Sequence, residues 1–221
     1  MLRPVRWLSL GTLLLVLSVA PSAAAQPAVE TWARAQARSL LAQGNAALAS
    51  GDVSGATRLF HESVTMDGSF EDAYLALGAL RERSGDAAEA ERTYAVALEH
   101  LPGASSTHLA RGRLRWRLGR HAEARDDLAA ALAIRPDDLA LRSELIDRSV
   151  EDGDFPRALA LSRGARRQLE RSGDEAALAR VRLRIKALSA LVGQADPLRA
   201  GHRGATATRR SIEAIARARG L

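Results

Sequence analysis

Four glycines recur at one fixed interval along the chain, and this spacing constrains the fold more than any other feature. Gly51, Gly85, Gly119 and Gly153 each lie 34 residues apart. Three further series keep the same interval: Ala56, Ala90, Ala124 and Ala158; Gly44, Gly78 and Gly112; and Pro102 and Pro136. Four independent series in one register indicate a tandem array of a single supersecondary unit.

Each unit is predicted to be a pair of antiparallel helices. The glycine of the first series ends the first helix or makes the turn after it, because glycine takes a left-handed backbone conformation at little cost. Asp52, Asp86 and Asp154 follow directly and are placed to cap the second helix. Proline closes a unit because it cannot continue a helix.

The residues between these markers predict how the helices pack. Small residues such as Gly78 on the first helix and Ala90 on the second let the two backbones approach closely. Large apolar residues that are again 34 apart are expected to fill the space between neighbouring hairpins, and these are Phe60, Tyr94 and Leu128.

The second unit, residues 71–104, resembles the tetratricopeptide repeat. It matches the pattern of that family at Tyr74, Leu77, Gly78, Gly85, Ala90, Tyr94, Ala97 and Pro102. The other units span about 37–70, 105–138 and 139–172, and each keeps part of the pattern. The third has His108 and Arg111 at its first two apolar positions, which predicts a wetter first helix.

The segments at the two ends of the array complete the expected fold. An amphipathic helix over 174–192 places Leu178, Val181, Ile185, Leu188 and Val192 on one stripe. It is predicted to cover the last repeat, because a solenoid must hide the apolar faces of its outer units. The resemblance therefore implies an all-α, right-handed solenoid over 26–193 with a C-terminal capping helix.

The N-terminus has the three parts of a secretory signal peptide. Arg3 and Arg6 precede an apolar run of about 14 residues and then small residues that end at Ala25. The run is short for a membrane span, which needs about 20 residues. We expect cleavage after Ala25 and a periplasmic or secreted location. The sequence has no cysteine, so disulfides and thiolate metal sites are excluded.

The net charge of +6 is confined to the ends of the chain. Residues 26–193 contain 24 basic and 24 acidic residues, whereas residues 194–221 contain six arginines against Asp196 and Glu213. The neutral body argues against a nucleic-acid-binding surface. The tail has two interpretations: a solvated segment, which is favoured, or a short amphipathic helix for an acidic partner or an anionic membrane surface.

The motifs that carry chemistry are missing from the sequence. The five histidines show no metal-binding spacing, and no phosphate loop or nucleophile elbow occurs. The adjacent acids Asp126–Asp127 and Asp137–Asp138 are interpreted as surface or helix-cap residues rather than acid–base pairs. We therefore expect a protein that is not an enzyme and that needs no cofactor or metal.

The resemblance implies that the concave face, lined by the first helix of each repeat, binds another protein. The expected partner-binding residues are Asn45, Leu75, Ala79, Glu82, Leu109, Arg113, Trp116, Arg117 and Asp147. Trp116 between two arginines has the composition of a binding hot spot. Equally, it could pack against the next hairpin. The family's clamp for C-terminal carboxylates is not predicted, because Leu41 and Ala110 stand where basic residues belong.

Together these features predict a non-enzymatic adaptor that binds a peptide or a helix in its concave groove. The alternative is binding of an anionic polymer or membrane surface through the arginine-rich tail. The two hypotheses differ in salt dependence, because binding through the tail would weaken steeply as ionic strength rises.

Overall fold

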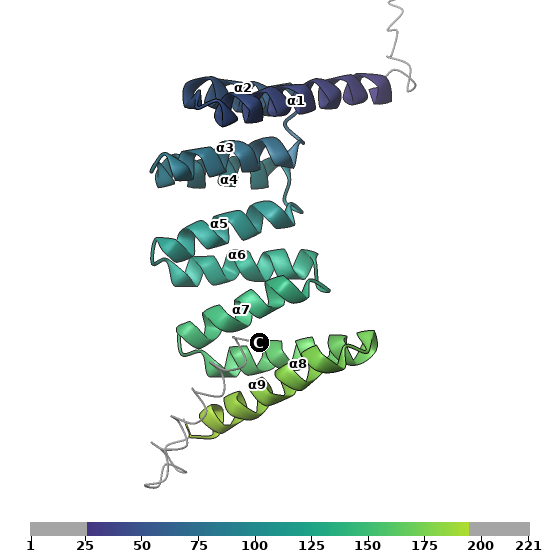
Figure 1. Ribbon diagram of the computed structural model, residues 1–221, viewed down its shortest axis with the longest axis vertical. Coiled ribbons are helices and arrows are strands. Elements are labelled where there is room, and N and C mark those ends of the chain that lie inside the picture. The colour runs from purple at the N-terminus through teal and green to yellow at the C-terminus, as the bar shows by residue number, and fades with distance from the viewer. Residues whose placement is uncertain (1–25, 195–221) are drawn as a thin grey trace, which may run out of the picture.

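The computed structural model describes residues 26–194. In this range the chain forms nine helices and no strand, which confirms the predicted all-α solenoid. The helices stack one after another along the long axis of the molecule (Figure 1). The predicted signal peptide over 1–25 and the tail from residue 195 onward lie outside the described residues.

Eight of the helices pair into four hairpins, and the ninth follows them. The hairpins are α1 (Gln26–Ala49) with α2 (Val53–Met66), α3 (Glu71–Arg83) with α4 (Ala87–His100), α5 (Ser105–Arg117) with α6 (His121–Ile134), and α7 (Leu139–Glu151) with α8 (Phe155–Ser172). The last helix is α9 (Glu175–Gln194).

The glycines of the first series make the turn inside each hairpin. Gly51, Gly85, Gly119 and Gly153 have φ angles of 87°, 82°, 76° and 74°. An L-residue with a side chain is strained in this left-handed region, so the turn requires glycine. The sequence left open whether these glycines end the helix or form the turn, and the structure places them in the turn.

Aspartates cap the second helices as predicted. The carboxylate of Asp52 accepts a hydrogen bond of 2.8 Å from the Gly55 amide, and Asp86 and Asp154 make the equivalent bond three residues onward. These bonds satisfy amides that have no partner within the helix. The third hairpin differs, because Arg120 occupies this position and its side chain makes no capping bond.

Glycines on the first helices let the two helices of a hairpin come together. A Cβ atom at Gly78 would lie 2.3 Å from the Tyr94 ring, and one at Gly44 would lie 2.5 Å from the Phe60 ring. Each ring therefore covers the glycine of its own hairpin. It also contacts the next hairpin, as Tyr94 does at Leu114. We expected these residues to fill the space between neighbouring hairpins, and the structure adds that they also pack inside their own hairpin.

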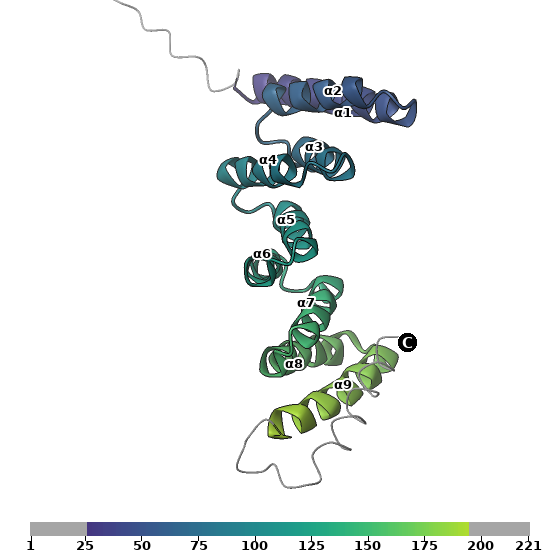
Figure 2. The same cartoon turned by 90° about the vertical axis from the view of Figure 1, so that its left-hand side faces the viewer.

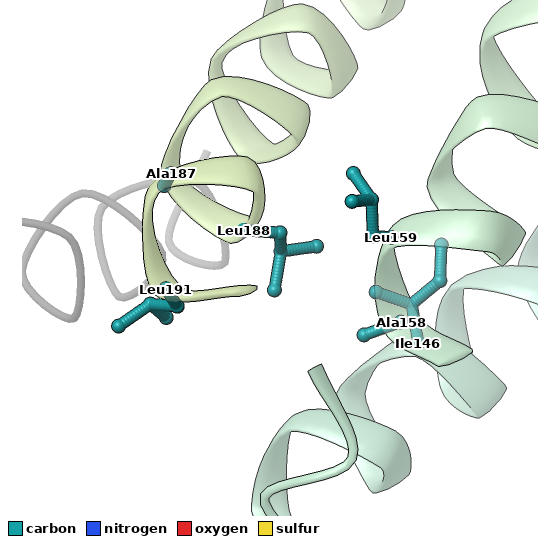
Figure 3. Packing of buried hydrophobic residues seen from close by; sticks show 6 residues of the cluster. All are labelled: Ile146, Ala158, Leu159, Ala187, Leu188 and Leu191. Atoms are coloured by element: carbon teal, nitrogen blue, oxygen red, sulfur yellow. The ribbon is translucent and has the colours of Figure 1, made fainter. Parts of the chain in front are cut away.

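Helix α9 covers the last hairpin, and Figure 3 shows Leu188 facing Leu159 and Ile146 across that seam. The predicted stripe is correct at Leu178 and Leu188, which are fully buried. The three other predicted positions are only partly buried. The buried face is completed instead by Arg184, Ala187 and Leu191.

Candidate functional site

The first helices of the hairpins form one side of the stack, which we call the first-helix face. In Figure 2, α3 and α5 lie to the right of α4 and α6, and α7 lies above α8. Two hollows lie at or beside this face. One of about 560 Å³ lies at the end of the first two hairpins, where Arg38 and Asp72 meet the end of α4 and the loop after it, and one of about 430 Å³ lies on α7 and is lined by Ser143 and Asp147 among others.

All of the predicted partner-binding residues lie on α1, α3, α5 or α7. The exposed ones are Asn45, Ala79, Arg113 and Arg117, and the partly exposed ones are Leu75, Glu82, Leu109, Trp116 and Asp147. Leu75 and Leu109 are partly withdrawn because they pack against buried residues of neighbouring helices. Their role in binding a partner remains a prediction.

Two ion pairs cross between neighbouring first helices at the centre of this face. Arg113 on α5 donates to Glu144 on α7, with nitrogen–oxygen distances of 2.6 and 3.1 Å. Arg117 on α5 pairs with Glu82 on α3. Glu82 also accepts a 2.7 Å hydrogen bond from the Tyr94 hydroxyl. Helix α5 is therefore joined by charge to both of its first-helix neighbours.

Within both pairs the cation is exposed and the carboxylate is covered. The side chains of Arg113 and Arg117 are 51% and 58% exposed, whereas those of Glu144 and Glu82 are 18% and 17% exposed. A molecule that approaches the centre of the first-helix face therefore meets guanidinium groups. Each guanidinium has five N–H donors, more than one carboxylate uses.

The carboxylate of Glu144 stays ionised over an extended pH range. Partial burial by itself raises the pKa of Glu144. Hydrogen bonds and charge from Arg113 and Arg148 lower this pKa by more than burial raises it, so the net pKa lies below its usual value. Favourable pairing thus exceeds the cost of desolvation at this position.

Trp116 is held between an imidazole ring and a guanidinium group rather than projecting freely. Its ring stacks on His121, with ring centroids 4.2 Å apart and planes inclined by 5°, and the Arg148 guanidinium lies 4.6 Å from the ring centroid. His121 belongs to α6 and Arg148 to α7, so Trp116 packs within its hairpin and against the next one. Such stacking and cation–π contacts stabilise the seam.

The sequence interpretation of Asp127 as a surface or cap residue is wrong. Asp127 is 4% exposed and accepts hydrogen bonds from Arg111 at 2.6 and 2.9 Å and from Arg115 at 2.8 Å, and His108 lies 3.3 Å away. A buried carboxylate needs such partners. The cluster explains why His108 and Arg111 can replace apolar residues of the repeat, as the predicted wetter helix implied.

A second acid ties the second hairpin to the third. Glu91 on α4 accepts hydrogen bonds from Arg115, at 2.7 Å, and from Arg120. Burial alone raises the pKa of Glu91, but these two arginines lower it below its usual value. Arg115 also donates to Asp127 on α6. One guanidinium therefore bridges the contact between α5 and α6 inside the third hairpin and the contact of α5 with α4 of the second hairpin.

The part of the chain that the structure describes contains no cluster of three or more residues suited to hold a metal ion. None of its helices is both long enough and apolar enough to cross a membrane. The arrangement on the first-helix face can supply hydrogen-bond donors, positive charge and partly exposed apolar side chains, which are means of binding.

Comparison with known proteins identifies the fold. No family model matches the sequence, and no curated protein matches it. A solved structure of MamA superposes with a TM-score of 0.56 at 14% identity, covering 83% of this chain and 90% of MamA. The chain has the tetratricopeptide-repeat fold.

Other tetratricopeptide-repeat structures resemble shorter parts of the chain. A second MamA structure gives a TM-score of 0.50 at 15% identity, covering 80% of this chain and 97% of that one. The first tetratricopeptide-repeat domain of RPAP3, also called Spaghetti, was solved with an HSP90 peptide. It gives a TM-score of 0.47 at 20% identity, and the match covers 53% of this chain and 94% of that domain.

Proposed function

We propose that this chain is a non-enzymatic interaction scaffold that binds a segment of a partner protein along the first-helix face. The observation that carries the proposal is the unequal exposure of the two central ion pairs. Arg113 and Arg117 face solvent while their carboxylate partners are covered, so the centre of the face is complementary to acidic groups.

The proposed segment is extended or helical, and it is acidic where it crosses α5. Ala79, which is exposed and small, lies on α3 three residues before Glu82, the partner of Arg117, and leaves room there for backbone or side chains of the partner. The partly exposed Leu75 and Leu109 offer apolar contact on the same helices. Charged groups of this kind fix the orientation of a bound partner and select which partner binds, whereas the modest apolar surface adds contact area.

We place this activity in the periplasm or outside the cell, because residues 1–25 have the composition of a secretory signal. The alternative, binding through the arginine-rich tail, concerns residues beyond the described range and remains a prediction from the sequence alone.

Site-specific photo-crosslinking in the native host tests the proposal. A photoreactive amino acid at Ala79 on α3 is expected to give a defined adduct with a partner protein. The matched control is Val96 on α4, which is 42% exposed but lies on a second helix. The adduct should disappear when Arg117 is changed to Glu. Equal adducts from both positions would contradict binding at the first-helix face.

A further inference from the structure

A cavity of about 190 Å³ lies where α7, α8 and α9 meet. Its walls are mostly apolar and come from all three helices, including Leu139 and Ile146 on α7, Leu169 on α8 and Val181 on α9. This volume is close to that of cavities that hold a single aromatic ring. The space therefore fits one apolar side chain rather than a drug-sized molecule, for which pockets of about 300–1,000 Å³ are typical.

Two arginines lie at this cavity, and its lining contains no acid. Arg184 is 7% exposed and sits 3.5 Å from Asp147 of α7. Arg180, one helical turn earlier, is exposed, and among the described residues it makes no hydrogen bond or ion pair. An apolar cavity with a guanidinium at its mouth is complementary to an apolar group beside a carboxylate.

The cavity adjoins the first-helix face. Ser143 lines both this cavity and the hollow of about 430 Å³ on the exposed side of α7. A chain that runs along the first-helix face toward α9 therefore passes the mouth of the cavity. This continuity favours a peptide over a free small molecule as the occupant.

We infer that the cavity is an anchor site for the partner segment, accepting one leucine- or phenylalanine-sized side chain while Arg180 at its mouth binds a neighbouring acidic side chain. The inference rests on the proposed function and adds the chemistry of the segment at one point, an apolar residue flanked by acids. Arg180 provides the accessible charge, and the apolar walls select the side chain.

Amide chemical shifts of the chain from residue 26 onward, titrated with short capped peptides, test the anchor site. The probe is acetyl-Glu-Leu-Glu-amide, and the matched controls are acetyl-Lys-Leu-Lys-amide and acetyl-Glu-Gly-Glu-amide. We expect the first peptide to shift the amides of Ala177 and Val181 with an affinity at least tenfold above either control. Equal binding of the acidic and basic leucine peptides would overturn the inference.

Two variants separate charge from shape. Arg180→Glu should abolish the preference for the acidic peptide, whereas Arg182→Glu, an exposed position on α9 outside the cavity lining, should leave it unchanged. Ala177→Leu places atoms in the cavity and should remove binding of the leucine peptide without removing the fold, which the dispersion of the remaining amides reports.

Further arms distinguish other occupants and other sites. Sodium hexanoate binding as tightly as the acidic leucine peptide would reassign the cavity to a free carboxylate. Loss of peptide binding in Arg117→Glu would place the peptide at the centre of the first-helix face and overturn the anchor. Crosslinking at Ala79 tests the scaffold function separately. If the Ala177→Leu variant still bound the leucine peptide, the anchor would be refuted. If the Ala79 adduct also formed, the scaffold function would stand.

Discussion

Arg113 on α5 and Glu144 on α7 share three hydrogen-bond contacts although 31 residues separate them. The arginine remains half exposed in this pair and the glutamate does not. The same arrangement recurs between Arg117 and Glu82. The solenoid thus uses acids to hold its first helices together and leaves the bases available to a partner.

Charge reversal at Arg117 should weaken partner binding at least tenfold and lower stability only modestly, although it brings a second carboxylate beside Glu82. The pair with Glu82 is mostly exposed on the arginine side, and such pairs contribute roughly 0–1 kcal/mol. Binding is measured by the yield of the Ala79 adduct and stability by thermal unfolding. Arg92→Glu, an exposed change on α4, is the matched control. If binding survived in Arg117→Glu, the centre of the first-helix face would not be the site.

Trp116→Ala should destabilise the fold by roughly 2–3 kcal/mol. The ring packs against His121 and Arg148, so its removal leaves a gap, although partial exposure keeps the cost below the 3–5 kcal/mol of a fully buried tryptophan. Trp32, which is 63% exposed, is the control, and its replacement by Ala should change stability by less than about 0.5 kcal/mol. Urea unfolding measures both. An equal change in unfolding free energy for the two variants would mean that the Trp116 contacts do not stabilise the fold.

Asp127→Ala should cost roughly 3–5 kcal/mol of unfolding free energy, because it leaves Arg111 and Arg115 partly buried without their shared carboxylate. The neighbouring acid Asp126 is exposed, and Asp126→Ala should lie within about 0.5 kcal/mol of the unaltered chain. The comparison uses chemical denaturation at neutral pH. A loss at Asp127 no greater than that at Asp126 would show that the cluster does not stabilise the third hairpin.

Gly78→Ala should destabilise the second hairpin by roughly 1–3 kcal/mol, since the added methyl group would overlap the Tyr94 ring. Gly103, in the loop after α4, has open space around the same position and serves as the control. The midpoint of thermal unfolding distinguishes the two. The prediction fails if the two alanine variants melt together.

Stability should fall as the pH is lowered below about 4.5. The pKa values of Glu91 and Glu144 are lower in the folded chain than their ordinary value of 4.5. Groups with a depressed folded pKa contribute stability that is fully present above the unfolded pKa and is lost as the pH falls through the folded pKa.

Urea midpoints between pH 7 and pH 3 provide the measurement. The double variant Glu91→Gln, Glu144→Gln should be less stable at pH 7 and should lose less stability on acidification, because the titrating groups are gone. The control is Glu99→Gln, an exposed glutamate on α4. An unchanged pH slope in the double variant would assign acid sensitivity to other carboxylates.

The backbone of this fold could be predicted because it depends on local requirements that recur. A left-handed glycine turn and an aspartate cap are visible in the sequence at Gly85 and Asp86 and need no knowledge of the rest of the chain. The spacing of 34 residues then predicts the same hairpin in the neighbouring repeats.

The side-chain network could not be predicted, since it depends on partners far apart in sequence. Asp127 was interpreted as a surface or helix-cap acid because adjacent acids are more often that than an acid–base pair, and nothing local reveals that Arg111 and Arg115 converge on it. Trp116 had two interpretations because its contacts lie on different helices. The burial of Arg184 on α9 was missed because an arginine interrupts an apolar stripe.

The ionic interior of the third hairpin has a mechanical consequence. Apolar seams are non-directional and tolerate small slides, whereas hydrogen bonds from Arg111 and Arg115 to one carboxylate fix an angle between α5 and α6. In a stack where each hairpin touches mainly its neighbours, such a fixed angle makes the third hairpin a rigid element. Bending of the solenoid should therefore concentrate in the seams that are lined by apolar clusters, between the first two hairpins and between the fourth hairpin and α9, so that the two ends flex while the middle keeps its shape.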